Sequence, residues 1–203
     1  MHTSALSHLR RVDPVLGAVI DRDGPCPLKP HADGSHFGYV VRCIVYQQLS
    51  GKAAATIYGR VLALYGGAEP TPAQLVKTTG VTLRAVGLST RKAEYVKDLA
   101  ARAHAHTLPI ERIHEMSDGE VIDTLVSVRG IGRWTAQMVL MFRLGRLDVF
   151  PELDLGVQKG VQQLLKMRTL PTPEKMTRIG ERWAPYRTIA AWYMWRLLEL
   201  EPE

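Results

Sequence analysis

The segment from Leu125 to Phe142, LVSVRGIGRWTAQMVLMF, constrains the fold most, because two glycines interrupt a helical pattern of apolar residues. Residues with helical spacing lie on both sides of the interruption: Val121, Ile122, Leu125 and Val126 before it, and Trp134, Met138, Met141 and Phe142 after it. Between them, Gly130 and Gly132 flank Ile131, and glycine allows a very tight turn because it tolerates positive φ. The pattern predicts two helices joined by a short hairpin, with Ile131 packed between them.

A hairpin of this kind can bind phosphate. Gly130 and Gly132 leave backbone N–H groups at the start of the second helix open to an approaching phosphate. Such contacts position a protein on DNA without reading its sequence. A G-x-G pair alone strongly favours an ordinary corner between two helices. The longer string GIGRWTA, from Gly130 to Ala136, is followed by an apolar helix and favours the DNA-binding hairpin.

Helical signals also dominate the rest of the sequence, which contains no convincing pair of alternating strands. Helix starts are predicted at residues that commonly cap helices: Ser35, Thr71 before Pro72, Ser89 or Thr90, Ser117 or Asp118, and Thr172 before Pro173. A Gly- and Pro-rich loop over 21–35 is expected to follow one short N-terminal helix, and a last helix is expected over about 185–200. We therefore expect an all-α protein.

Composition narrows the functional classes. The 203 residues are enough for one large domain or two small packed lobes, and the formal charge of +6 would attract nucleic acid or an anionic membrane. No apolar stretch reaches the roughly 20 residues that span a bilayer. Cys26 and Cys43 can supply neither a four-cysteine zinc site nor an iron–sulfur cluster, and the histidines are scattered. We expect a cytoplasmic protein with no membrane partner, and with Cys43 in its core.

Four blocks of sequence resemble one known family. LVSVRGIGRWTAQMVLMF resembles the helix-hairpin-helix of the base-excision DNA glycosylases, the HhH-GPD superfamily, and GRLDVFPELDLGVQKGV is similar to the loop that ends in their catalytic aspartate. VRCIVYQQLSGKAAATIYGRV and RWAPYRTIAAWYMWRLLE are similar to the first core helices and the C-terminal helix of the 3-methyladenine DNA glycosylase II (AlkA-type) branch. The resemblance covers roughly residues 37–200 in a consistent order.

This resemblance implies a two-lobed helical fold with the active cleft between the lobes. One lobe is expected over 35–147 and contains the hairpin, whereas the other pairs residues 1–34 with residues 148–203, which begin with the catalytic loop. The extra N-terminal domain of AlkA-type enzymes is expected to be absent. The hairpin often has proline where this chain has Arg129, and the effect of that exchange is open.

By the same resemblance, Asp154 is the catalytic residue. Excision of a base creates positive charge on the sugar, and a nearby carboxylate stabilises that charge and helps to activate water. From spacing alone, an acid directly before the helix LGVQKGVQQLLK would be an N-cap, and the two roles can coexist. Two other acids lie near the loop: Asp148 is expected to be structural and Glu152 exposed to solvent.

The residue after Gly132-Arg133 decides the type of reaction. In relatives that also cleave the strand, a lysine there forms a Schiff base with the sugar, whereas this chain has Trp134. The resemblance therefore implies a monofunctional enzyme that excises alkylated bases, such as 3-methyladenine and related alkylpurines, from duplex DNA. The alternatives are a catalytically silent helix-hairpin-helix DNA-binding protein and a bifunctional glycosylase/lyase.

To reach its base, such an enzyme flips the nucleotide out of the duplex. By resemblance Leu49, next to Gln48, is the wedge that fills the gap, although the helical pattern also permits a core position. Trp134 and Trp195 match the positions of the base pocket, where aromatic faces would attract a cationic purine. Met138 stands where some relatives have an aromatic residue. Tyr39 is a further pocket candidate, and an exposed tyrosine is the alternative.

The remaining expectations concern the hairpin and the catalytic loop. Gly130, Gly132, Arg133 and Thr135 are expected to contact DNA, together with Gln48 and Leu49. The family's hairpin can hold a structural monovalent cation through backbone carbonyls, and the matching positions are Val126, Val128 and Ile131. Arg187 is expected either to hold the catalytic loop by an ion pair or to be solvated. We expect no catalytic cofactor, and a monomer.

Overall fold

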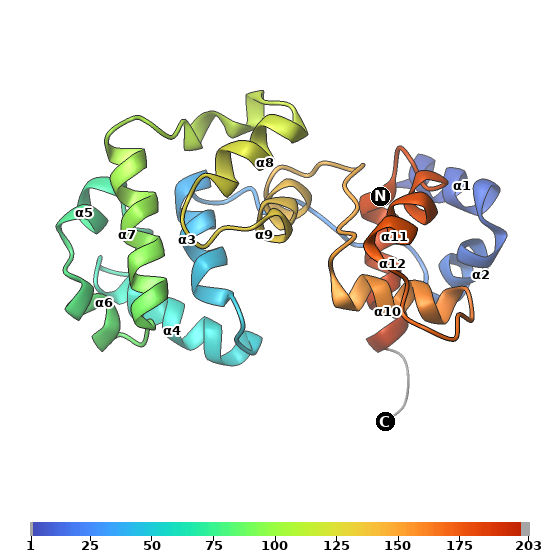
Figure 1. Ribbon diagram of the computed structural model, residues 1–203, viewed down its shortest axis with the longest axis horizontal. Helices are drawn as coiled ribbons and strands as arrows, with labels where there is room; N and C mark the ends of the chain where they lie inside the picture. Colours follow the sequence, from blue (N-terminus) through green and yellow to red (C-terminus); the bar gives the residue numbers. More distant parts are fainter. Residues whose placement is uncertain (1, 200–203) are drawn as a thin grey trace. The chain divides into compact units, whose positions relative to one another are not determined.

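The computed structural model describes residues 2–199, which form helices and loops and contain no strands, so the predicted all-α class is confirmed (Figure 1). The chain divides into two compact units. Unit 1 combines the chain up to His31 with the chain from Leu140 onward, and unit 2 is Ala32–Val139. The sequence predicts boundaries after residues 34 and 147, whereas the structure divides after residues 31 and 139.

Unit 2 contains the hairpin. Its elements are α3 (His36–Tyr46), α4 (Gly51–Ala63), α5 (Pro72–Lys77), α6 (Gly80–Ala85), α7 (Thr90–His104), the 3₁₀ helix η1 (Ile110–Glu115), α8 (Asp118–Val126) and α9 (Arg133–Met138). The predicted helix starts are confirmed, because the side chains of Ser35, Thr71, Ser89 and Ser117 each accept a backbone N–H of the first helical turn. Helix α3 ends at Tyr46, so Leu49 lies in the following turn and not on the same helix.

Helix α7 is the centre of unit 2, where it packs against α3, α5 and α6 (Figure 1). Its apolar residues Val96, Leu99 and Ala100 are buried. Lys97 on the same helix donates three hydrogen bonds to carbonyl oxygens of Leu75, Val76 and Thr78, at 3.2, 2.5 and 2.8 Å. These carbonyls lie at the end of α5, where the helix leaves them without backbone donors.

Unit 1 contains α1 (Thr3–Val12), α2 (Pro14–Asp23), α10 (Leu155–Leu164), α11 (Pro173–Glu181) and α12 (Arg187–Glu199), and its first residues after α9 complete a π-helical turn, η2 (Val139–Arg143). Thr172 caps α11 as predicted. The prediction of one short N-terminal helix is wrong. Pro14 has no N–H to continue α1, and the Asp13 carboxylate caps a second helix instead. The predicted end of the last helix, Leu200, lies outside the described residues.

Two hydrogen bonds join the N-terminal and the C-terminal segments of unit 1. The indole N–H of Trp183 donates to Asp13 Oδ2 at 2.9 Å, and the Tyr193 hydroxyl donates to the Gly24 carbonyl at 2.7 Å. Helices α10 and α12 pack closely because Gly160 has no side chain, and a Cβ there would lie 2.3 Å from the Met194 carbonyl oxygen. Tyr193 is fully buried. None of the described helices is long and apolar enough to span a bilayer.

Candidate active site

Asp154 is the residue directly before α10, and one oxygen of its carboxylate accepts two hydrogen bonds. Oδ1 accepts the Val157 backbone N–H at 2.8 Å and the Trp195 indole N–H at 2.9 Å. The first contact confirms the N-cap role, because the side chain accepts a backbone donor of the first helical turn. The second contact fixes the direction of the carboxylate. Asp154 is half-buried, so a reactant can approach it from solvent.

Trp195 reaches Asp154 because the neighbouring side chains leave room for its indole. Gly156 is the decisive neighbour, since a Cβ there would lie 2.8 Å from Cδ1 of the indole. On α12 the ring also lies near Phe142, with ring centroids 5.9 Å apart and planes tilted by 32°. The sequence indicates Trp195 only as a pocket residue. Its hydrogen bond to Asp154 joins residues 41 positions apart, and no local pattern announces it.

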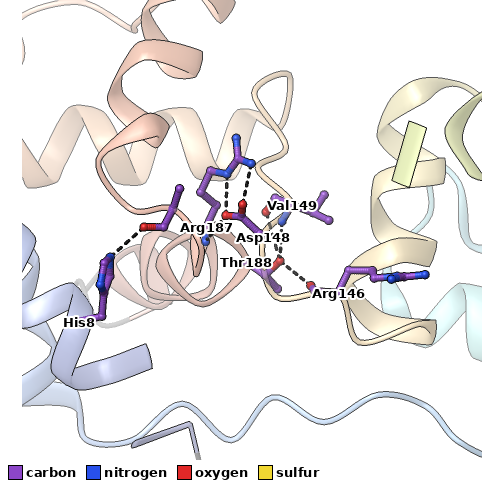
Figure 2. A network of polar contacts seen from close by, with 7 residues as sticks. His8, Arg146, Asp148, Val149, Arg187 and Thr188 are labelled. Atoms are coloured by element: carbon purple, nitrogen blue, oxygen red, sulfur yellow. Dashed lines mark hydrogen bonds and ion pairs between the residues drawn. The ribbon is translucent and has the colours of Figure 1, made fainter. Parts of the chain in front are cut away.

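The loop that precedes Asp154 is held by the ion pair between Asp148 and Arg187. Arg187 Nε and Nη2 donate to the two carboxylate oxygens of Asp148 at 2.7 and 2.8 Å (Figure 2). The neighbouring Thr188 hydroxyl donates to the Arg146 carbonyl at 2.7 Å and accepts the Val149 N–H at 3.0 Å. The structural role of Asp148 and the ion pair of Arg187 are thus confirmed. The first two residues of α12, Arg187 and Thr188, hold the start of the loop.

Glu152 corrects one expectation about this loop. The residue is half-buried, not exposed as predicted. Its backbone carbonyl accepts a hydrogen bond from Gln158 Nε2 at 2.8 Å, and its N–H donates to the Phe150 carbonyl at 3.0 Å. These contacts fold the loop over the first turns of α10, and this covers the residue. Asp154 and Glu152 therefore share a loop but differ in their surroundings.

The hairpin of unit 2 depends on Gly130. Its φ of 78° is one that residues with a side chain rarely adopt, and a Cβ there would lie 2.1 Å from the Tyr95 ring. Gly132 differs, since its φ of −96° is open to any residue and it serves as N-cap of α9. The positive φ predicted for the pair is therefore needed at Gly130 only. Ile131 and Val128 are buried, and Ile131 N–H donates to the Val128 carbonyl at 3.1 Å.

A backbone hydrogen bond accounts for Arg129 at the hairpin position where the family often has proline. Its backbone N–H donates to Asp98 Oδ2 at 3.0 Å, a bond that proline could not make. Its guanidinium lies 3.5 Å from Glu94, and Asp98 also pairs with Arg102 at 3.1 Å. In this chain the first half of the hairpin is thus hydrogen-bonded to α7.

A second set of contacts holds the turn between α3 and α4, and the sequence gives no sign of it. Gln47 Nε2 donates to the Gly130 carbonyl at 2.9 Å and to Thr135 Oγ1 at 3.5 Å. Lys92 Nζ donates to the carbonyls of Val45 and Gln47 at 2.7 and 2.6 Å. Gln48, the next residue, has a positive φ of 55°. The turn is therefore bonded both to the hairpin and to α7.

The structure brings several predicted site residues together around one apolar hollow of about 250 Å³ in unit 2. Its lining residues are Arg42, Cys43, Tyr46, Gln47, Gln48, Leu49, Trp134, Thr135 and Met138. Trp134 is 41% exposed and Leu49 is 39% exposed, so neither is a core residue. Cys43 was predicted to lie in the core, and this is wrong, because the residue is only partly buried at the wall of this hollow. Burial nevertheless raises the pKa of its thiol to about 12, which keeps it neutral.

Tyr39 does not join this group. The side chain is 7% exposed and lies in the core of unit 2, apart from the residues that line the hollow. The alternative of an exposed tyrosine is therefore wrong, and the hollow offers no support for the predicted pocket role. The reason is that α3 is buried on nearly all sides, so a residue off its apolar stripe is still covered.

A second hollow of about 390 Å³ adjoins the first and shares Gln47, Gln48, Trp134 and Thr135 with it. Its other lining residues are polar or lie on the hairpin and α7: Ser89, Arg91, Lys92, Tyr95 and Gly130. Gly132 and Arg133, the other predicted DNA contacts, are exposed, whereas Thr135 is buried. Val126, one of the predicted cation-site residues, has an exposed side chain. Across residues 2–199, no three His, Cys, Asp or Glu side chains are grouped to hold a metal ion.

Comparisons with known proteins agree on one family. The family model of the HhH-GPD superfamily base excision DNA repair proteins matches residues 41–185. The alkylbase DNA glycosidase-like protein mag2 of Schizosaccharomyces pombe is 31% identical over 97% of this chain and 93% of its own. The 3-methyladenine DNA glycosylase Mag1 of that organism, in complex with abasic DNA, is 32% identical with a TM-score of 0.89 over 98% of both chains. A Bacillus halodurans DNA-3-methyladenine glycosidase is 36% identical with a TM-score of 0.86, over 97% of this chain and 89% of its own.

Proposed function

Because the chain belongs to the HhH-GPD superfamily of base excision DNA repair proteins, we propose that it is a monofunctional DNA glycosylase that excises alkylated bases from duplex DNA. The observation that carries this proposal is the Asp154 carboxylate, oriented by Val157 and Trp195 in the loop where the family's catalytic aspartate is expected. The names of its relatives, which are 3-methyladenine DNA glycosylases, support alkylpurines as the first substrates to test.

The reaction breaks the bond between the sugar C1′ and a base nitrogen. Positive charge develops on the sugar, and the Asp154 carboxylate stabilises it and helps to orient water. The donors on Oδ1 hold the carboxylate in place before the substrate arrives, so little reorganisation is needed during the reaction. An alkylated purine is often already cationic and leaves easily, which lowers the demand for a general acid.

Trp134 supports hydrolysis without strand cleavage. It occupies the position where strand-cleaving relatives are expected to carry the lysine of a Schiff base, and an indole cannot form one. Trp134 and Met138 would instead form a wall of the base pocket in the apolar hollow of unit 2. A cationic purine would gain from contact with the exposed indole face.

Duplex DNA is the proposed partner of the hairpin. Gly130, Gly132, Arg133 and Thr135 would contact the backbone, and Leu49 with Gln48 would fill the place of the flipped base. A monovalent cation bound by the carbonyls of Val126, Val128 and Ile131 would add positive charge next to a phosphate. Each carbonyl oxygen has two lone pairs, so the Val128 oxygen that accepts Ile131 N–H keeps one for an ion. We further propose a monomer that acts in the cytoplasm.

The test is release of free base from methylated duplex DNA, with and without alkali. We expect release by the wild type, with strand breaks only after alkali. Asp154→Asn should abolish release and leave DNA binding nearly unchanged, and Glu152→Gln in the same loop is the matched control that should keep activity. Breaks without alkali would indicate the bifunctional alternative. Binding without release from any alkylated duplex would indicate the silent DNA-binding protein.

A further inference from the structure

The turn from Gln47 to Ser50 joins α3 to α4 and carries Gln48 and Leu49, both exposed. Gln48 has a φ of 55°, a left-handed conformation that is unfavourable for a residue with a side chain. A residue remains in such a conformation only when the surrounding structure fixes it, and such residues often lie at functional sites. The contacts that hold this turn therefore bear on its function.

Lys92 supplies the first of these contacts. It lies in the first turn of α7 and donates from Nζ to the carbonyls of Val45 and Gln47, at 2.7 and 2.6 Å. These carbonyls are at the C-terminal end of α3, which stops at Tyr46 and leaves its last carbonyls without helical partners. One ammonium group thus caps α3 and fixes the residue before Gln48.

Gln47 supplies the second contact. Its side-chain amide donates to the Gly130 carbonyl at 2.9 Å and approaches Thr135 Oγ1 at 3.5 Å. Gly130 is the hairpin residue that must be glycine, because its φ is positive and the Tyr95 ring leaves no room for a Cβ. The turn is consequently fixed relative to the hairpin through Gln47 and relative to α7 through Lys92, all within unit 2.

We propose that Lys92 is a positioning residue for base flipping. Through Gln47, Lys92 holds the turn that carries Gln48 and Leu49 against the hairpin. The inference rests on the proposed glycosylase function, because flipping has meaning only for an enzyme that extrudes a nucleotide. Rigid positioning matters for this step, since a wedge that yields cannot stabilise an unstacked duplex.

The geometry also assigns Lys92 a role different from that of a nucleophile. Burial lowers the pKa of Lys92, as it does for lysines that attack sugars or carbonyls. The two carbonyls, however, each accept a hydrogen bond from Nζ, and a Schiff base would keep at most one N–H on that nitrogen, so its formation would break at least one of these bonds. Lys92 lines the second hollow, but its ammonium group is hydrogen-bonded to the protein's own backbone.

The test compares Lys92→Met with Lys97→Met. Lys97 is a matched control on the same helix, because its ammonium also caps a neighbouring helix, α5, and contacts neither the turn nor the hairpin. Flipping is measured as the fluorescence of 2-aminopurine next to the lesion, with each lysine variant combined with Asp154→Asn. Excision is measured separately, with Asp154 intact and under single-turnover conditions. In the Asp154→Asn background, the flipping signal does not depend on chemistry.

We expect Lys92→Met to lower the flipping signal and the excision rate on the order of tenfold, and to leave binding of undamaged duplex within about threefold. Lys97→Met should reduce thermal stability to a similar degree but keep flipping and excision near the wild-type level. Gln47→Met, which removes the side-chain donor to Gly130 and Thr135, is a second variant if Lys92→Met does not fold. It should reproduce the defect, and the double variant should be no worse than the stronger single variant.

Equal flipping by the Lys92 and Lys97 variants would overturn the inference. A wild-type adduct with DNA that borohydride traps, and that Lys92→Met abolishes, would overturn it in favour of a nucleophile. The proposed function fails separately, if wild-type protein flips the base but releases none.

Discussion

The indole N–H of Trp195 donates to Oδ1 of Asp154 over 2.9 Å, and the same oxygen accepts the N–H of Val157. One carboxylate oxygen is thus fixed by α12 and by the first turn of α10. The indole reaches this oxygen because residue 156 is glycine. A residue expected to line a base pocket therefore also orients the candidate catalytic group.

Trp195→Phe tests this relationship, because phenylalanine keeps an aromatic ring but cannot donate a hydrogen bond. Loss of one hydrogen bond to a charged group should lower the single-turnover excision rate on the order of tenfold. Binding of duplex DNA should change little. Trp192→Phe is the control on the same helix, since the ring of Trp192 packs edge-on against Tyr193 and not against Asp154. An excision rate for Trp195→Phe equal to that of the control would show that the indole N–H does not matter.

The two hairpin glycines should respond differently to alanine. Gly130→Ala places a Cβ at positive φ and 2.1 Å from the Tyr95 ring, so we expect a loss of more than about 2 kcal/mol of stability and a loss of DNA binding. Gly132→Ala meets no atom within 4 Å at an ordinary φ, and should cost less than about 1 kcal/mol. Chemical denaturation and DNA titration of both variants check this pair. Similar losses in both would mean that the turn tolerates no side chain for some other reason.

Asp98 should matter more to the hairpin than the Arg129 side chain does. Asp98→Ala removes the acceptor of the Arg129 N–H and should destabilise the protein by about 1 kcal/mol. Arg129→Ala keeps the backbone donor and loses only an exposed pair with Glu94, so its cost should lie within about 0.5 kcal/mol. Thermal denaturation of the two variants measures the difference. A larger loss for Arg129→Ala would reverse this order and assign the hairpin's support to the guanidinium.

Stability should fall in alkaline solution. Burial raises the pKa of the Cys43 thiol to about 12 and that of Cys26 to about 11. In the unfolded chain a thiol ionises near a pKa of about 8.5, so the folded state holds more protons in the interval between these values. Stability is therefore fully present below that interval and is lost as the pH rises through it. Melting temperatures at about pH 8 and about pH 10.5 should show the fall, and Cys43→Ala should lose less than the wild type. An equal fall in the variant would exclude Cys43 as a contributor.

Local chemistry in the sequence was sufficient to predict much of the fold. Ser35, Thr71, Ser89, Ser117 and Thr172 cap the helices that they were expected to cap, because an N-cap needs only a side-chain oxygen and the next few backbone N–H groups. The hairpin at Gly130 and the cap at Asp154 are equally local. At Pro14 the local signal was present but was missed: the residue that ends α1 also begins α2.

Exposure was harder to predict, because it depends on neighbours from other parts of the chain. Tyr39 lies off the apolar stripe of α3 and is still buried, since other elements of unit 2 cover that side of the helix. Leu49 could be assigned neither to the core nor to the surface from helical spacing, and the end of α3 at Tyr46 exposes it.

The sequence by itself determined most of the helix starts and the hairpin, because each depends on residues a few positions apart, and its resemblance to a family indicated the candidate catalytic aspartate. Only the tertiary structure decided what holds those groups in place. Trp195 and Asp154 are 41 positions apart, Gln47 and Gly130 are 83 apart, and Asp98 and Arg129 are 31 apart. Such bonds form when packed helices bring a donor and an acceptor to about 3 Å, a condition that periodicity and capping patterns do not encode.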